Sequence, residues 1–167
     1  MPRSAVTLRS FPPVVSARSR ILVLGTMPGD ASLKAGQYYA HPRNAFWPIM
    51  GELFGAHREV PYERRLALLD EAGVALWDSL HSCVRPGSLD AAITNATAND
   101  FAELFARFPK ISSVFFNGST SEALFRRHVL PKLGDIPYSL TRLPSTSPAN
   151  ARLSLAEKLT LWRVIVG

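Results

Sequence analysis

The sequence contains a single cysteine, Cys83, among 167 residues. A disulfide within the chain needs two cysteines, and structural zinc and iron–sulfur centres use several. An internal disulfide is therefore excluded, and a cysteine-built metal centre is not expected. The histidines also lack the close spacing of metal ligands. There are four of them, His41, His57, His81 and His128. We therefore expect neither a bound metal nor any other cofactor.

Long apolar runs are absent as well. No segment approaches the roughly 20 apolar residues of a membrane-spanning helix. The N-terminal segment 1–16 carries Arg3 and Arg9, but serine, arginine and the Pro12-Pro13 pair interrupt its apolar residues, so we expect no signal peptide. These absences predict a cytoplasmic protein, associated with the nucleoid if the source is bacterial, and no membrane partner.

Common nucleotide-binding and hydrolase patterns are also missing. The chain has no GxGxxG run, no GxxxxGKS or GxxxxGKT run and no GxSxG run. A standard dinucleotide site, a standard triphosphate site and a serine nucleophile elbow are therefore not expected.

Basic residues, by contrast, are in excess. The chain has 19 Lys and Arg against 13 Asp and Glu, which gives a formal net charge of +6. This charge favours anionic partners such as nucleic acid, although a basic soluble protein without such a partner has the same composition. The length suits one domain with a sizeable core, so we expect residues 1–167 to form a single domain.

Apolar strand-like runs alternate with helical patterns along the chain, which is typical of a parallel sheet built from crossover units. We predict an α/β fold, a three-layer α/β/α sandwich with a central four-stranded, mainly parallel sheet. The expected strands are 21–24, 74–77, 113–116 and 138–143, and the expected helices are 44–54, 62–72, 99–108, 120–130 and 153–166. Asn99 and Ser154 are the expected helix caps, the latter forming a capping box with Glu157.

The loops that follow the expected strands share a composition of amides, hydroxyls, glycine and aromatic rings. They contain Gly25–Gly29 with the segment 38–44, then Asp78-Ser79, Asn117-Gly118 and Pro144–Pro148. Loops after parallel strands converge at one edge of a sheet, where ligands of such folds bind. Amides and aromatic faces suit a flat, neutral, hydrogen-bonding ligand, so we expect the pocket to hold a nucleobase.

Three motifs in these loops resemble those of a known family. They are GTMPG at 25–29, YYAHPRNAFW at 38–47 and LPSTSPAN at 143–150. In this order and spacing, the chain resembles the uracil-DNA glycosylase superfamily, and within it the hypoxanthine-DNA (deoxyinosine) glycosylase branch.

The resemblance implies a monofunctional, monomeric enzyme of base excision repair. Such an enzyme flips a deaminated base out of double- or single-stranded DNA and hydrolyses its N-glycosidic bond. Hypoxanthine is the expected base, with uracil and xanthine as alternatives. Two other functions share the pocket features and stay open: a non-catalytic nucleic-acid-binding module of the same fold, and a hydrolase of free nucleosides or nucleotides.

The chain departs from the best-known uracil-specific members of that superfamily at two positions. Those enzymes carry an aspartate in the first motif and a histidine opening the second, where this chain has Met27 and Leu143. By resemblance, Asn44 is then the candidate for positioning the attacking water, because an oxocarbenium-like sugar needs a placed water more than a strong base. The alternative for Asn44 is a helix N-cap.

The resemblance also assigns binding roles. The expected base-binding residues are Gly25, Thr26, Met27, Pro28, Tyr39, Phe46 and Asn117, with Phe46 stacking on the base. The expected DNA-binding residues are Ser145, Ser147, Asn150 and Arg152, with weaker phosphate candidates at Arg43, Arg85 and Arg142. The alternatives are an Asn-Gly turn at 117 and a solvated loop at 149–152. We assign no acid–base role to Asp78, Asp30 or His41, because either aspartate could cap a turn or helix.

Overall fold

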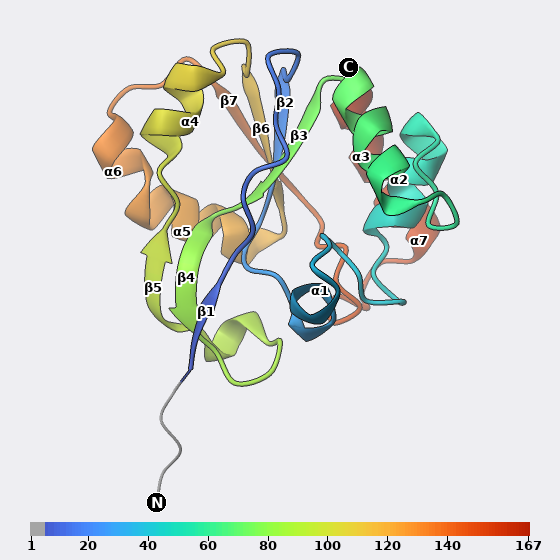
Figure 1. Ribbon diagram of the computed structural model, residues 1–167, viewed down its shortest axis with the longest axis horizontal. Helices are drawn as coiled ribbons and strands as arrows, with labels where there is room; N and C mark the ends of the chain where they lie inside the picture. The colour runs from blue at the N-terminus through green and yellow to red at the C-terminus, as the bar shows by residue number, and fades with distance from the viewer. Residues whose placement is uncertain (1–5) are drawn as a thin grey trace, which may run out of the picture.

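The computed structural model describes residues 6–167, so Arg3 and the rest of segment 1–5 lie outside the described residues. A sheet of four parallel strands, in the order β3-β2-β6-β7, forms its centre (Figure 1). The strands are β2 (Ile21–Gly25), β3 (Val74–Asp78), β6 (Ser113–Asn117) and β7 (Ser139–Leu143). The four predicted strands are confirmed, and their ends differ from prediction by at most one residue.

Side chains of the sheet alternate between two apolar clusters. Leu22 and Leu24 pack into one cluster, while Val23 packs into the other together with Leu76 and Phe115. Strands buried on both faces carry continuous apolar runs, which is why these segments stand out in the sequence.

Helices cover both faces of the sheet, so the predicted three-layer α/β/α arrangement is confirmed (Figure 1). One face carries α2 (Phe46–Phe54), α3 (Tyr62–Glu71) and α7 (Leu155–Trp162), and the other carries α4 (Phe101–Arg107), α5 (Ser119–His128) and α6 (Leu130–Leu133). Short helical turns are α1 (Asp30–Ala35), η1 (Asp90–Ala92) and η2 (Arg163–Val166). In the described part of the chain, no helix is both long and apolar enough to cross a membrane.

A second, three-stranded antiparallel sheet was not predicted. It contains β1 (Thr7–Arg9), β4 (Leu80–Val84) and β5 (Thr94–Ala98) in the order β1-β4-β5. These strands are short and mix polar with apolar residues, so their periodicity is weak. The sheet lies beside the carboxyl end of the parallel strands (Figure 1), and the β4–β5 connection reaches the loop after β2 through a hydrogen bond from Asp30 N to Ser88 Oγ of 2.9 Å.

One of the two predicted helix caps is wrong. Helix α4 is capped by Asp100, whose carboxylate accepts from Glu103 N, and not by Asn99. The Asn99 amide instead donates to the carbonyls of Asp78 and Leu80, at 2.8 and 3.0 Å, and fixes the chain where β3 passes into β4. The capping box at the start of α7 is confirmed.

Candidate active site

A cavity of about 760 Å³ opens at the carboxyl ends of the parallel strands. This volume is typical of small-molecule sites. Of the predicted site residues, the cavity wall contains Gly25, Thr26, Met27, Pro28, Tyr39, Asn44, Asn117, Ser145, Ser147 and Asn150. The cavity is lined by neither Phe46 nor Arg152. The loops from three separate motifs therefore do meet in one pocket.

Asn44 lies half-buried in the pocket wall, just before helix α2. Its Oδ1 accepts from the backbone N–H of Phe46 at 2.9 Å. Ala45 is the N-cap residue, but this bond still ties Asn44 to the start of the helix, so part of the capping alternative is realised. The bond fixes the amide and leaves one Oδ1 lone pair, and no described residue accepts from Nδ2. The side chain can therefore also bind a ligand or a water molecule.

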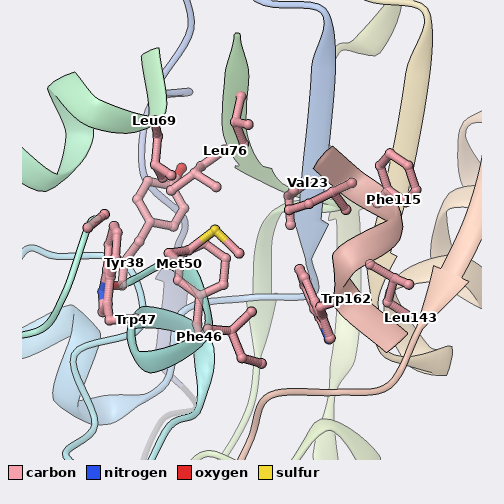
Figure 2. Packing of buried hydrophobic residues seen from close by; sticks show 14 residues of the cluster. Val23, Tyr38, Phe46, Trp47, Met50, Leu69, Leu76, Phe115, Leu143 and Trp162 are labelled. Atoms are coloured by element: carbon pink, nitrogen blue, oxygen red, sulfur yellow. The ribbon is translucent and has the colours of Figure 1, made fainter. Parts of the chain in front are cut away.

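The predicted stacking role of Phe46 is wrong. Its side chain is fully buried in the core beside Met50 and Trp162 (Figure 2). Its ring stacks on Tyr39 with centroids 4.0 Å apart. Tyr39 lines the pocket, and Phe46 supports the far face of that tyrosine. Of these two rings, only Tyr39 lines the pocket.

Tyr39 has an unusual backbone conformation, with φ at +55° in the left-handed region. A bulky residue rarely occupies this region, and such strain is concentrated at functional sites. Its hydroxyl is buried, and no described residue is hydrogen-bonded to it. The loop thus delivers an aromatic ring and an unpaired hydroxyl to the pocket.

Asn117, at the end of β6, is buried and tied at both ends of its amide to one residue, Thr146. Its Oδ1 accepts from the Thr146 backbone N–H at 2.9 Å, and its Nδ2 donates to the Thr146 hydroxyl at 2.9 Å. A backbone N–H can only donate, so the orientation of the amide is fixed. No further hydrogen bond of this amide is formed within residues 6–167, although it lies close enough to Tyr39 to oppose the rise that burial causes in the pKa of that phenol. The Thr146 carbonyl also accepts from Ala45 N at 2.9 Å, which joins the Asn44 segment to Asn117.

Thr146 was missed in the sequence although it stands inside the motif LPSTSPAN. The threonine is 1% exposed. Nothing in the local pattern distinguishes it from Ser145 and Ser147, which are half-buried in the pocket wall. Only the tertiary hydrogen bonds identify it.

Helix α7 holds the loop that contains the motif LPSTSPAN, residues 143–150, in place. Buried Lys158 donates from Nζ to the Asn150 carbonyl at 2.8 Å, and Trp162 donates from Nε1 to the Pro144 carbonyl at 2.9 Å. The Asn150 amide donates to the Ser145 carbonyl, which closes the loop on itself. Arg152 is exposed just beyond the loop. These hydrogen bonds therefore hold the loop in place, and the exposed guanidinium of Arg152 lies just beyond it.

The β4–β5 connection supplies a wall that sequence reasoning missed, through Ser88, Leu89 and Asp90. The turn signal Pro86-Gly87 between two short β-prone segments could have indicated this hairpin. Arg85 does not face solvent as a phosphate ligand would. It is 4% exposed, and its guanidinium donates to the Gly87 and Pro28 carbonyls. Arg43 and Arg142 are exposed, as a phosphate ligand requires.

Met27 and Leu143 are both buried side chains of the pocket wall. Neither can activate water or donate to a leaving group. The backbone N–H groups of Met27 and Gly29 have no hydrogen-bond acceptor among residues 6–167. This loop therefore contributes an apolar side chain to the pocket wall and has two backbone N–H groups without an acceptor among the described residues.

Asp78 is the last residue of β3, at the carboxyl edge of the parallel sheet, and it also lines the pocket. It is 3% exposed, and burial raises the pKa of its carboxyl to about 7, with a smaller contribution from Asp90 and an opposing one from Arg85. Over residues 6–167, no group of three or more His, Cys, Asp or Glu side chains is placed to hold a metal ion.

Comparison with known proteins gives consistent matches to this architecture. The model of the uracil DNA glycosylase superfamily matches residues 12–165. A hypoxanthine DNA glycosylase of Methanosarcina acetivorans is 35% identical over 147 residues, 87% of this chain and 90% of the relative. One of Methanosarcina barkeri is 35% identical over 155 residues, 92% and 94% of the two chains.

A solved structure agrees as well. It is a solution NMR structure of a protein from Methanosarcina acetivorans that is described as a putative uracil DNA glycosylase. Its TM-score is 0.79 at 32% identity, with 97% of this chain and 100% of that chain covered.

Proposed function

Because this chain belongs to the uracil DNA glycosylase superfamily and is a DNA glycosylase, we propose that it releases hypoxanthine from DNA. The observation that carries this choice of base is the match to two hypoxanthine DNA glycosylases over about nine-tenths of both chains. The pocket is consistent with it, since the fixed Asn117 amide keeps one donor and one acceptor for polar atoms of a flipped base.

Asn44 positions the water that attacks the sugar. Departure of the base leaves an oxocarbenium-like sugar, which a neutral water can capture if it is held in place. Phe46 N–H holds Oδ1 of Asn44 by one lone pair, so the second lone pair is aimed and can accept from that water. A fixed group loses little freedom in the transition state.

The loop after β2 stabilises the leaving base. As the bond breaks, negative charge develops on the base, and the unpaired N–H groups of Met27 and Gly29 are suited to face it. The ring of Tyr39, supported by Phe46, stacks on the base. Strand cleavage by such an enzyme needs an amine nucleophile, and no lysine is among the described residues that line the pocket. This supports a monofunctional enzyme.

Loop 144–152 contacts the DNA. Ser145 and Ser147 present hydroxyls to phosphates, Asn150 borders the gap left by the flipped nucleotide, and exposed Arg152 neutralises a phosphate. The net charge of +6 assists the encounter with DNA. The protein works as a monomer in the cytoplasm, where its substrate lies.

The test uses duplex and single-stranded oligonucleotides that carry one hypoxanthine, uracil or xanthine, with EDTA present. We expect abasic sites at hypoxanthine, revealed as alkali-labile breaks, and no breaks before alkali treatment. Duplex binding without base release would favour the non-catalytic module, and release from free deoxyinosine alone would favour a nucleoside hydrolase. Either result would overturn the proposal.

A further inference from the structure

Asp78 is a buried carboxyl in the pocket wall that the proposed mechanism does not use. Its Oδ2 is buried without a hydrogen-bond partner among residues 6–167. An unpaired polar atom in a protein interior is costly, and such atoms usually mark a role with a ligand. We propose that Asp78, in its protonated form, donates a hydrogen bond to the flipped base and thereby recognises its lactam edge.

The strand register places Asp78 at the same edge of the sheet as Gly25 and Asn117, two of the proposed base-binding residues. Asp78 pairs with Gly25 across β3 and β2, and Asn117 ends the next strand on the other side of Gly25. A Cβ at position 25 would lie 2.5 Å from Asp78 Oδ1 and 3.0 Å from the Tyr39 hydroxyl. The missing side chain of Gly25 thus leaves a space that the Asp78 carboxyl and the Tyr39 hydroxyl both border. The Asp78 backbone is held there by Asn99.

Protonation decides what this carboxyl can recognise. A protonated carboxyl has one donor and one acceptor, the complement of the adjacent C=O and N–H of hypoxanthine. An ionised carboxylate only accepts, so it opposes the carbonyl of hypoxanthine and favours two adjacent N–H donors. Guanine has that pair on its ring nitrogen and its 2-amino group. A neutral Asp78 therefore fits the lactam edge of hypoxanthine, whereas an ionised Asp78 would favour guanine, which shares that edge and adds the 2-amino donor.

The surroundings bring the pKa of Asp78 close to physiological pH. Burial and, to a smaller extent, the negative charge of Asp90 on the β4–β5 connection together raise it to about 7, against an opposing contribution from Arg85. From the loop after α1, the Tyr38 and Tyr39 side chains face it as neutral phenols, and their own pKa values are raised by burial and by Asp78. His41 and Asp30 also line the pocket wall, and the histidine is therefore replaced in a control variant below.

The inference rests on the proposed hypoxanthine activity. Its test is the pH profile of kcat/KM for release of hypoxanthine from a duplex. A group with a folded pKa of about 7 is mostly protonated at pH 6.5 and mostly ionised at pH 8.5, so wild-type kcat/KM should fall about 25-fold over this interval. Asp78→Asn keeps a donor and an acceptor but does not titrate. It should retain activity at pH 6.5 within about fivefold and change less than about threefold up to pH 8.5.

Two further variants distinguish this role from a structural one. Asp90→Asn removes a negative charge that raises the pKa of Asp78, so the midpoint of the wild-type profile should move to lower pH. His41→Asn should keep the fall with pH. A fall that disappears in His41→Asn would assign the titration to the histidine and overturn the inference.

The outcomes separate the two proposals. A wild-type enzyme that releases no hypoxanthine at any pH overturns the proposed function and this inference with it. Release at a rate that does not fall from pH 6.5 to 8.5 overturns only the role of Asp78, whether or not any variant folds. The same holds if Asp78→Asn follows the wild-type profile, or if it is inactive at pH 6.5 with an unchanged melting temperature.

Discussion

Replacing Asn44 by serine should remove most of the base release and leave the protein as stable as the wild type. The side chain has two separable contacts, a hydrogen bond from Phe46 N–H to Oδ1 and a free face toward the pocket. A serine hydroxyl can accept from the N–H two residues ahead, as asparagine does, but it is shorter and carries no amide. Alanine loses both contacts.

The two losses differ in size. The bond to Phe46 N spans 2.9 Å at a half-buried position and contributes about 1 kcal/mol to the free energy of unfolding. In a chain of 167 residues, that lowers the melting temperature by about 2–4 °C in Asn44→Ala. A domain stable by roughly 5–15 kcal/mol stays folded after such a loss. Loss of a preorganised group at the reacting centre costs about 10²–10³ in rate, or roughly 3–4 kcal/mol.

The assay is single-turnover release of hypoxanthine with enzyme in excess, followed as alkali-labile breaks in a labelled duplex, alongside thermal melting of the same preparations. We expect both variants to lose about 10²–10³ in rate, and only Asn44→Ala to melt earlier. A wild-type rate in Asn44→Ser would show that the side chain serves the start of helix α2 alone. The reasoning about water would then be refuted.

Three further changes test other parts of the pocket. Asn117→Asp removes the amide donor, so base preference among hypoxanthine, uracil and xanthine should change by tenfold or more, and an unchanged preference would count against base recognition there. Gly25→Ala places a methyl group 2.5 Å from Asp78 Oδ1, so the rate of hypoxanthine release should fall more than tenfold relative to the wild type. Full activity would show that the space beside Gly25 is not needed. Arg152→Ala should weaken duplex binding and reduce the slope of log K against log salt concentration by about one. The control substitution Arg127→Ala, at an exposed position near the C-terminal end of α5, should change neither quantity. Equal salt slopes in all three proteins would remove Arg152 from the DNA interface.

The sequence predicted the parallel sheet because its strands are buried on both faces and read as continuous apolar runs. The pocket followed from that topology, since loops after parallel strands must converge. The antiparallel sheet was missed because β5 is a run of Thr, Asn and Ala, in which strand pairing rather than hydrophobicity forms the structure.

Individual side chains were harder to place than elements. Phe46 and Tyr39 both stand in the same aromatic motif, and helical periodicity cannot say which ring faces the core when Phe46, Trp47, Ile49 and Met50 are all buried. Thr146 was missed because its partners come from distant parts of the chain. Asp78 was noticed, but its protonation depends on burial, which a sequence does not give.

The hydrogen bonds of Thr146 link the two roles that we propose for the pocket, base recognition at Asn117 and water positioning at Asn44. Asn44 and Asn117 are far apart along the chain, yet the backbone of Thr146 accepts from Ala45, beside the first, and donates to the second. A base that fits poorly against Asn117 would displace Thr146 and shift the neighbouring water holder away from the sugar. If both roles hold, an enzyme that scans roughly 10⁶–10⁹ undamaged sites would have a second rejection step after binding, because a poorly fitting base would face a misplaced water.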